Sequence, residues 1–168
     1  MILPHIFLKN TNVISAATDI VFLPRVEKLL QRNSSSRLHR ILKKFMHPYE
    51  IKQFETLVNS GSSLKHKSIY IAGVWASKES LFKTLPHSSD RPSAIDIYTK
   101  LAFKSNDPDG KPNLNLDQKR FSTGEHNITY WNEYLHSTRY EISISHDQDY
   151  LICILLHLRD ANLNKWSV

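Results

Sequence analysis

Residues 68–85 constrain the fold most, because they form the longest stretch of the chain with helical periodicity. Val74, Leu81 and Leu85 fall on one face of this expected helix, so that face must be covered by another layer of structure. Lys78 falls close to the same apolar face, where a solvated lysine is not expected. The segment therefore predicts a long, largely buried helix with one lysine in unusual surroundings.

Apolar spacing elsewhere predicts helices early in the chain and strands mostly later. We expect helices over residues 24–32, 37–46 and 47–58, and strands over residues 12–21, 95–98, 140–145 and 150–157. The last strand is expected to be buried on both faces. Residues 106–110 read as a turn, and the polar stretch 113–137 reads as a loop. This order predicts an α+β fold, with residues 1–168 in a single domain.

The chain is basic, with 22 Lys and Arg against 16 Asp and Glu and a formal net charge of +6 at pH 7. Such an excess favours an acidic partner, which could be nucleic acid, anionic lipid, a phosphorylated small molecule or an acidic protein. Residues 37–44 (RLHRILKK) would suit a nucleic-acid-binding module, although no recognisable motif of such modules accompanies them. No stretch approaches the ~20 apolar residues of a membrane helix. Charge alone does not choose the partner.

Several kinds of catalytic or metal site are disfavoured by residue type and spacing. The single cysteine, Cys153, excludes an intramolecular disulfide or a zinc site built on several thiolates, and we expect it to be buried. The nine histidines show no metal-ligand spacing, and the four glycines form no phosphate-binding loop. Ser145 and His146 are neighbours on an expected strand, so they point to opposite sides and disfavour a Ser-His-Asp relay. A site for a hard cation remains.

Asp19 and Glu79 are the carboxylates that such a site would use. Asp19 ends an apolar strand, and Glu79 lies 60 residues later on the long helix, so a strand packed under that helix could bring them together. Magnesium prefers one or two carboxylates, with water and phosphate oxygens completing its coordination. The structural alternatives are that Asp19 caps the next helix and that Glu79 pairs with Lys83 on the surface.

Four short motifs, in this order, resemble the motif set of the 4'-phosphopantetheinyl transferase family. They are Thr18-Asp19-Ile20-Val21 with Arg25, Trp75-Ala76-Ser77-Lys78-Glu79 with Lys83, Gly110-Lys111-Pro112, and Ser143-Ile144-Ser145-His146-Asp147. They span residues 13–156 and most resemble the small holo-acyl-carrier-protein synthase branch, in its fungal mitochondrial form. The resemblance implies the fold of that family, with a small antiparallel sheet packed against a long helix.

The same resemblance implies an activity. It is the Mg2+-dependent transfer of 4'-phosphopantetheine from coenzyme A to a serine of apo-acyl-carrier protein, with release of adenosine 3',5'-bisphosphate. Asp19 and Glu79 match the metal ligands of the family. Lys83 matches the lysine expected at the pyrophosphate, where it would bind coenzyme A and stabilise the leaving group. Either Glu79 or a metal-bound water could accept the serine proton.

Further residues are assigned by the resemblance alone. Lys111, Ser145 and His146 match segments that line the coenzyme A site, and Arg25, with Lys28 and Arg32 on the same expected helix, matches the surface that docks the carrier protein.

The resemblance also implies a homotrimer with the coenzyme A site between subunits, and a mitochondrial enzyme that supports fatty acid synthesis. Residues 1–10 show no clear transit peptide, so the cytoplasm is the other location considered. Two other functions are open. One is a basic nucleic-acid-binding module without catalysis, and the other is a carrier-binding subunit that has lost catalysis.

Overall fold

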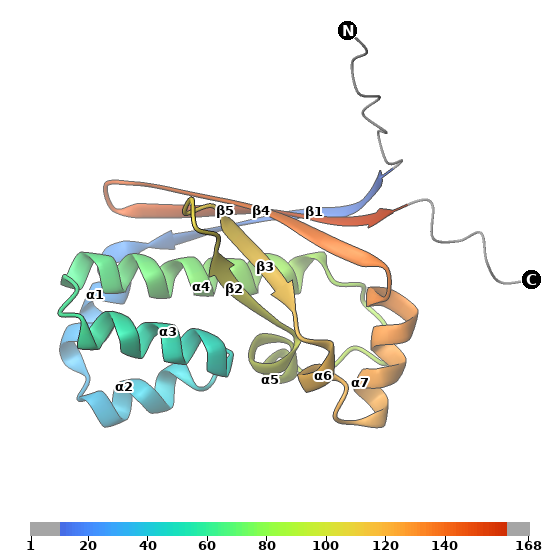
Figure 1. Ribbon diagram of the computed structural model, residues 1–168, viewed down its shortest axis with the longest axis horizontal. Helices are drawn as coiled ribbons and strands as arrows, with labels where there is room; N and C mark the ends of the chain where they lie inside the picture. Colours follow the sequence, from blue (N-terminus) through green and yellow to red (C-terminus); the bar gives the residue numbers. More distant parts are fainter. Residues whose placement is uncertain (1–10, 161–168) are drawn as a thin grey trace, which may run out of the picture.

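The computed structural model describes residues 11–160, so the N-terminal residues that were searched for a targeting signal lie outside it. A three-stranded antiparallel sheet of order β1-β5-β4 extends along one side of the molecule (Figure 1). Its strands are β1 (Thr11–Phe22), β4 (Thr138–Asp147) and β5 (Tyr150–Asp160). All the helices lie on the other side, with α4 (Leu64–Thr84) directly against the sheet. This arrangement confirms the predicted α+β fold.

The remaining elements cover the far side of α4. They are α1 (Leu23–Arg32), α2 (Ser35–Leu42), α3 (Pro48–Asn59), α5 (Ala94–Asp96), the π-helix η1 (Ile97–Leu101), the hairpin of β2 (Ala102–Asn106) and β3 (Pro112–Leu116), α6 (Gln118–Phe121), α7 (Glu125–Tyr130) and the π-helix η2 (Trp131–Leu135). The hairpin turn lies where the sequence predicts it, and Gly110 has a φ of +86° there, which favours glycine. No helix among the described residues is long and apolar enough to cross a membrane.

Local sequence signals account for the start of the early helices. Proline at the start of α1 and of α3 suits the first helical turn, where a backbone N–H has no partner within the helix. At α3 the Nδ1 of His47 accepts a hydrogen bond from the Tyr49 N–H, and Glu50 accepts one from the His47 N–H. These reciprocal bonds form a capping box that fixes the first turn.

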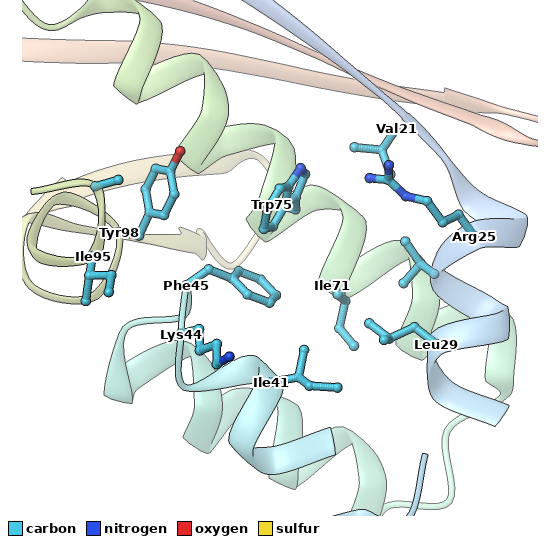
Figure 2. Close-up of a pocket in the computed structure, with 12 residues that line it drawn as sticks. Val21, Arg25, Leu29, Ile41, Lys44, Phe45, Ile71, Trp75, Ile95 and Tyr98 are labelled. Carbon is cyan, nitrogen blue, oxygen red and sulfur yellow. The ribbon is translucent and has the colours of Figure 1, made fainter. Parts of the chain in front are cut away.

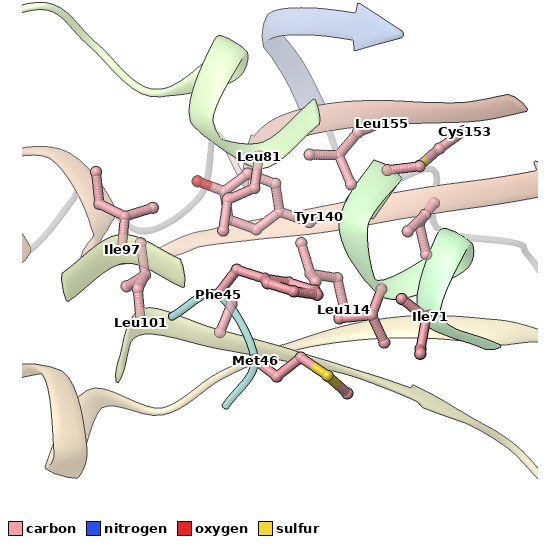
Figure 3. Close-up of a cluster of buried hydrophobic side chains, with 14 of the residues drawn as sticks. Phe45, Met46, Ile71, Leu81, Ile97, Leu101, Leu114, Tyr140, Cys153 and Leu155 are labelled. Atoms are coloured by element: carbon pink, nitrogen blue, oxygen red, sulfur yellow. The ribbon is translucent and has the colours of Figure 1, made fainter. Parts of the chain in front are cut away.

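The hydrophobic core fills the space on both sides of α4 (Figure 3). Cys153 and Leu155 of β5 face it from the sheet, while Leu101 and Leu114 face it from the hairpin side. Cys153 is fully buried, as predicted. Because residues from the sheet and from the hairpin side meet around one helix, α4 determines where the neighbouring elements lie.

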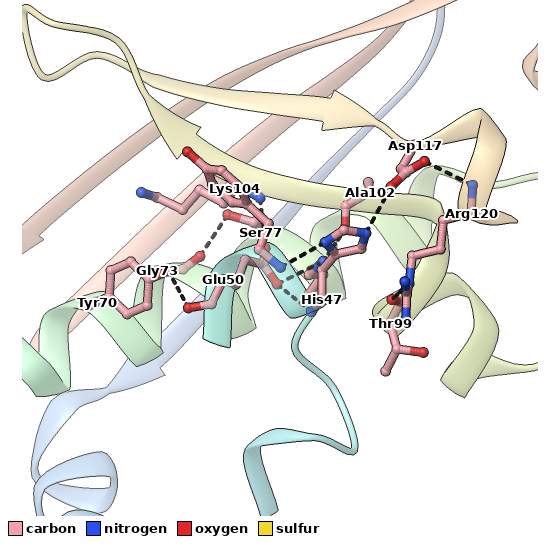
Figure 4. A network of polar contacts seen from close by, with 12 residues as sticks. His47, Glu50, Tyr70, Gly73, Ser77, Thr99, Ala102, Lys104, Asp117 and Arg120 are labelled. Atoms are coloured by element: carbon pink, nitrogen blue, oxygen red, sulfur yellow. Dashed lines mark hydrogen bonds and ion pairs between the residues drawn. The ribbon is translucent and has the colours of Figure 1, made fainter. Parts of the chain in front are cut away.

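A buried polar network ties α3 and β2 to α4 (Figure 4). Lys78 is 0% exposed, and its Nζ lies 3.1 Å from Oε2 of Glu50, which is also 0% exposed. Lys78 also donates to the carbonyl of Ala102, while Glu50 accepts from the N–H groups of His47 (2.8 Å) and Lys104 (2.7 Å). Burial raises the pKa of Glu50 and lowers that of Lys78, and their contact opposes both shifts. The unusual surroundings predicted for Lys78 are this ion pair.

Two predicted segments are wrong. Residues 95–98 form helix, because Ile97 and Leu101, four residues apart, are both fully buried whereas Ile95 is 63% exposed. Residues 113–137 are not a loop but contain β3, α6, α7 and η2. Phe121, Tyr130, Trp131 and Leu135 are buried there, and a few large apolar side chains are enough to fix this otherwise polar stretch.

The prediction that the last strand is buried on both faces is also wrong for the single chain. Leu151, Cys153 and Leu155 of β5 face α4 and are 0% exposed. Ile152 and Ile154 point to the other side of the sheet and are 40% and 49% exposed. The outer face of this sheet is therefore apolar yet open.

Candidate functional site

Asp19 and Lys83 meet where β1 passes the last turns of α4. The Lys83 Nζ lies 2.9 Å from Oδ1 of Asp19 and donates a second hydrogen bond of 2.9 Å to the carbonyl of Thr18. Asp19 pairs with Cys153 across the β1–β5 ladder, on the face of the sheet that α4 covers. The Asp19 side chain is 16% exposed and that of Lys83 is 46% exposed. The pair is therefore accessible to a ligand.

Glu79 lies one turn before Lys83, half-buried, and accepts a hydrogen bond of 2.9 Å from the hydroxyl of Tyr98 on η1. Burial, followed by the hydrogen bond to Glu79, raises the pKa of Tyr98, so this phenol stays protonated and donates. The charge of Asp19 acts on Tyr98 in the same direction. Glu79 thus contacts this phenol directly, and the charge of Asp19 acts on it from β1.

The two structural alternatives for these residues are wrong. Phe22, not Asp19, is the N-cap of α1, and no side chain caps that helix. Lys83 pairs with Asp19 on another element instead of with Glu79 on its own helix. Asp19 is therefore bound by Lys83 of α4 and Glu79 by Tyr98 of η1, so each carboxylate contacts another element rather than its own.

The donor set fits a hard cation. One oxygen of Asp19 contacts Lys83 and one oxygen of Glu79 contacts Tyr98, so within residues 11–160 the second oxygen of each carboxylate has no hydrogen-bond partner. Mg2+ is usually held by one or two carboxylates, with water and phosphate oxygens as its other ligands, so these two carboxylates suit it. Among the described residues no cluster of three or more His, Cys, Asp or Glu side chains is present.

Lys111, Ser145 and His146 lie away from this site. Lys111 is exposed in the β2–β3 turn. His146 borders a hollow of about 400 Å3, together with Gly73 and Gly110, at the N-terminal half of α4. Ser145 pairs with Ile152 on the outer face of the sheet, whereas His146 pairs with buried Leu151 on the inner face. Their opposite directions confirm that Ser145 and His146 cannot form a relay, and β5 separates their strand from Asp19.

A second cavity, of about 470 Å3, adjoins the Glu79 side of the site (Figure 2). Val26, Leu29, Ile41 and Ile71 form most of its apolar lining, together with Phe45 and Trp75. The Trp75 ring packs against Phe45 with centroids 5.0 Å apart. Arg25 of α1 borders the cavity, while Lys28 and Arg32 are exposed further along the same helix.

Tyr98 and Glu50 are the important polar residues that sequence reasoning missed. Tyr98 was hidden by the wrong strand prediction for residues 95–98, whereas the true helix brings its hydroxyl to Glu79. Glu50 was recognised only as part of a helix start. A signal for it existed in Lys78, because a lysine on an apolar helix face needs a buried carboxylate as partner.

Comparison with known proteins agrees with this geometry. A model of the 4'-phosphopantetheinyl transferase superfamily matches residues 15–154. The chain is 36% identical to the mitochondrial holo-[acyl-carrier-protein] synthase of Eremothecium gossypii, over 88% of this chain and 80% of that protein. The holo-ACP-synthase of Plasmodium yoelii superposes with a TM-score of 0.61 at 25% identity, covering 89% of this chain and 98% of the other. The holo-[acyl-carrier-protein] synthase of Helicobacter pylori, solved in complex with coenzyme A, gives 0.55 at 25% identity, with 85% and 99% covered.

Proposed function

The chain belongs to the 4'-phosphopantetheinyl transferase superfamily, and on that premise we propose that it is a holo-acyl-carrier-protein synthase. It would transfer the 4'-phosphopantetheine group of coenzyme A to a serine of apo-acyl-carrier protein and release adenosine 3',5'-bisphosphate. The observation that supports this most directly is that Lys83, one turn after Glu79 on α4, lies 2.9 Å from Asp19 of β1 at an accessible place.

Asp19 and Glu79 would hold the magnesium ion through their carboxylates. When bound, magnesium neutralises phosphate charge and helps to hold the attacking and leaving oxygens in line. Tyr98 keeps one oxygen of Glu79 in place, and the buried body of α4 holds Glu79 against β1. Because these supports are on regular elements, the two carboxylates are held ready before the substrate arrives.

Lys83 would bind the pyrophosphate of coenzyme A. In the free protein its Nζ contacts Asp19, and its long, half-exposed side chain can turn from that carboxylate to a phosphate oxygen. There it would stabilise negative charge that develops on the leaving adenosine bisphosphate. Either the Glu79 carboxylate or a water molecule on the metal would accept the proton of the carrier serine.

Lys111, Ser145 and His146 would contact coenzyme A from a neighbouring subunit. In one chain, β4 and β1 lie at opposite edges of the sheet, about 10 Å apart, so these residues do not complete the site around Asp19. The open apolar face, which includes Ile20 (63% exposed), Ile152 and Ile154, supports an assembly of several copies. We therefore propose a homotrimer with the coenzyme A site between subunits.

The carrier protein would dock on α1 through Arg25, Lys28 and Arg32. All three side chains are exposed, and their positive charge would meet an acidic surface of the carrier protein. Arg25 also borders the cavity beside Tyr98, which places this helix next to the proposed site. By similarity to the mitochondrial synthase of E. gossypii, we propose a mitochondrial location and a role in fatty acid synthesis there.

Mass spectrometry of apo-acyl-carrier protein incubated with the chain, coenzyme A and Mg2+ tests this function. We expect the carrier to gain the mass of one phosphopantetheine group, at its serine, with adenosine 3',5'-bisphosphate as the second product. Omission of Mg2+ with EDTA present should prevent the gain. An unchanged carrier, in a reaction where a known transferase modifies it, would refute the proposal.

A further inference from the structure

Arg91 follows the C-terminal end of α4 and contacts its last turn. Its Nη2 donates a hydrogen bond to the carbonyl of Phe82, and its Cζ lies 3.9 Å from the centroid of the Phe82 ring. Its Nη1 lies 2.8 Å from Nδ1 of His87, which accepts this bond because a guanidinium group can only donate. The side chain is half-buried, and these three contacts fix its guanidinium group in one place.

This place lies on the same side of α4 as Glu79. Phe82 follows Glu79 by three residues, so their side chains are neighbours on one face of the helix. The Phe82 ring meets the Tyr98 ring edge to face, with centroids 5.7 Å apart, and the Tyr98 hydroxyl donates to Glu79. Against burial, which raises the pKa of Tyr98, the charge of Arg91 acts to lower it. Arg91 is therefore within electrostatic reach of the hydroxyl that holds Glu79.

The positive charge of Arg91 has no carboxylate partner in the described part of the chain. No ion pair within residues 11–160 includes it, whereas Lys83 lies 2.9 Å from Asp19. The Nε of Arg91 is buried and has no hydrogen-bond partner there. A guanidinium group that contacts only a carbonyl, a ring face and an imidazole keeps its attraction for an anion, and one N–H of each terminal nitrogen is left to donate to it.

The charge balance around Glu79 favours a doubly charged anion. Lys83 and Arg91 balance the charges of Asp19 and Glu79, so a bound Mg2+ would leave the site with two positive charges. The diphosphate group of coenzyme A carries two negative charges, one on each phosphate, and these match. If Arg91 were neutral, one negative charge of the diphosphate would have no counterpart in the site.

We propose that Arg91 is a further substrate-binding residue, which donates to the diphosphate group of coenzyme A from the side of η1 while Lys83 donates from the side of β1. This rests on the proposed function and adds a residue to its donor site. A planar guanidinium group suits this contact because its N–H bonds can meet two oxygens of one phosphate, whereas a lysine acts as a point charge. Because the guanidinium is held in place before the substrate arrives, little entropy is lost when it binds.

Steady-state kinetics and isothermal titration of the full chain with Mg2+ test this role in Arg91→Met. We expect both the KM and the Kd for coenzyme A to rise about tenfold, with the KM for apo-carrier protein unchanged. Added salt should weaken coenzyme A binding more in wild type than in Arg91→Met, which has already lost one of the charges that salt screens. Lys119→Met is the matched control, with the same loss of one charge at an exposed position on α6, and should behave as wild type.

Two further measurements separate diphosphate binding from stabilisation of the α4 C-terminus, where a cation also interacts favourably with the last carbonyls. Inorganic pyrophosphate, as a competitive inhibitor against coenzyme A, should lose about as much affinity in Arg91→Met as coenzyme A does, because it carries only the diphosphate. Arg91→Lys keeps the charge but not the planar group, so its Kd for coenzyme A should lie between those of wild type and Arg91→Met. A role in stability alone would lower the urea midpoint of Arg91→Met and leave both affinities of the folded protein as in wild type.

Equal Kd values for coenzyme A in Arg91→Met and Lys119→Met would overturn the assignment of Arg91. Unchanged inhibition by pyrophosphate in Arg91→Met would overturn it as well, because the contact would then lie elsewhere on coenzyme A. A wild-type chain that binds coenzyme A but leaves the carrier unmodified would instead overturn the proposed function, so the two failures are distinguishable.

Discussion

Two lysine–carboxylate pairs lie five residues apart on α4, and their surroundings differ completely. Lys78 and Glu50 are sealed in the core, with side chains 1% and 0% exposed and 3.1 Å between their charged atoms. Lys83 and Asp19 are 2.9 Å apart, yet 46% of the lysine side chain is exposed. The residue types and distances are nearly the same, and only access to water separates them.

This difference determines what each pair can do. A buried charge cannot leave its partner without a large desolvation cost, so Lys78 and Glu50 hold α3, α4 and β2 together. An exposed pair is worth little to stability, and its members can exchange one partner for another. Lys83 can therefore exchange Asp19 for a phosphate, as the role proposed for it requires.

The largest expected effect comes from removing a carboxylate of the accessible site, Asp19 or Glu79, while the buried pair of Lys78 and Glu50 stays intact. Glu79→Ala, or Asp19→Ala, should lower the transfer rate by about 1000-fold or more, because a charge-stabilising contact in the transition state is lost. The free energy of unfolding should change by no more than about 1 kcal/mol. Glu55→Ala, on exposed α3 surface, is the matched control and should retain full activity. Full activity in Asp19→Ala would show that the metal site is misplaced.

The next largest effect is on stability and comes from breaking the buried pair of Lys78 and Glu50. Lys78→Met should lower the free energy of unfolding by about 3–5 kcal/mol, because it leaves Glu50 buried without its counter-ion. Lys83→Met, which removes the exposed lysine, should cost about 1 kcal/mol or less in the same urea titration. The double variant Lys78→Met/Glu50→Gln should recover much of the loss. If Lys78→Met and Lys83→Met unfold alike, burial does not separate the two pairs.

A third prediction concerns the pH dependence of stability, which His47, beside the buried pair of Lys78 and Glu50, should influence. The pKa of His47, beside Glu50 in the sealed network, is lowered to about 4, chiefly by burial. Below its ordinary value of 6.5 the unfolded chain binds a proton that the folded protein does not, so stability falls as pH drops from 6.5 towards 4. The loss should approach about 3 kcal/mol.

His47→Asn keeps a helix-capping oxygen but removes this titration. The stability advantage of wild type over His47→Asn, measured by urea unfolding, should therefore shrink as pH falls through that window. His136→Gln, at an exposed position, is the control. A constant difference between wild type and His47→Asn would contradict the assignment.

The smallest effect comes from removing the hydrogen bond between Tyr98 and Glu79 in the accessible site. Tyr98→Phe removes one hydrogen bond to Glu79 and should raise the KM for Mg2+ by about 2- to 10-fold, with a smaller change in the KM for coenzyme A. The Tyr98 ring contacts Phe82 and Trp75, and phenylalanine keeps those contacts. Tyr134→Phe, a half-buried tyrosine elsewhere, serves as the control. An unchanged KM for Mg2+ would show that the phenol does not position Glu79.

Strongly periodic segments were predictable because their own residues favour one structure. The long helix, α1, α3 and the strands of the main sheet lie where apolar spacing and proline positions place them, within a few residues. Residues 95–98 failed because a short apolar run fits a strand or a helix equally well, and the burial of Ile97 with Leu101 decides between them. The stretch 113–137 failed because its few apolar anchors are too widely spaced to show a period.

The sequence by itself determined the residue types of the site and their order along the chain. Asp19, Glu79 and Lys83 could be singled out by their chemistry and by the motifs around them, as could the basic segments of α1 and α2.

Only the tertiary structure decided which charges pair, which are open to water, and that Arg25 and Lys44 border one cavity. The physical reason is that a side chain's own chemistry is local, whereas burial and partner choice depend on segments far apart in sequence. Lys78 and Lys83 show this most simply, since the packing of β2 and α3 over one turn of α4 buries the first lysine and leaves the second open to water.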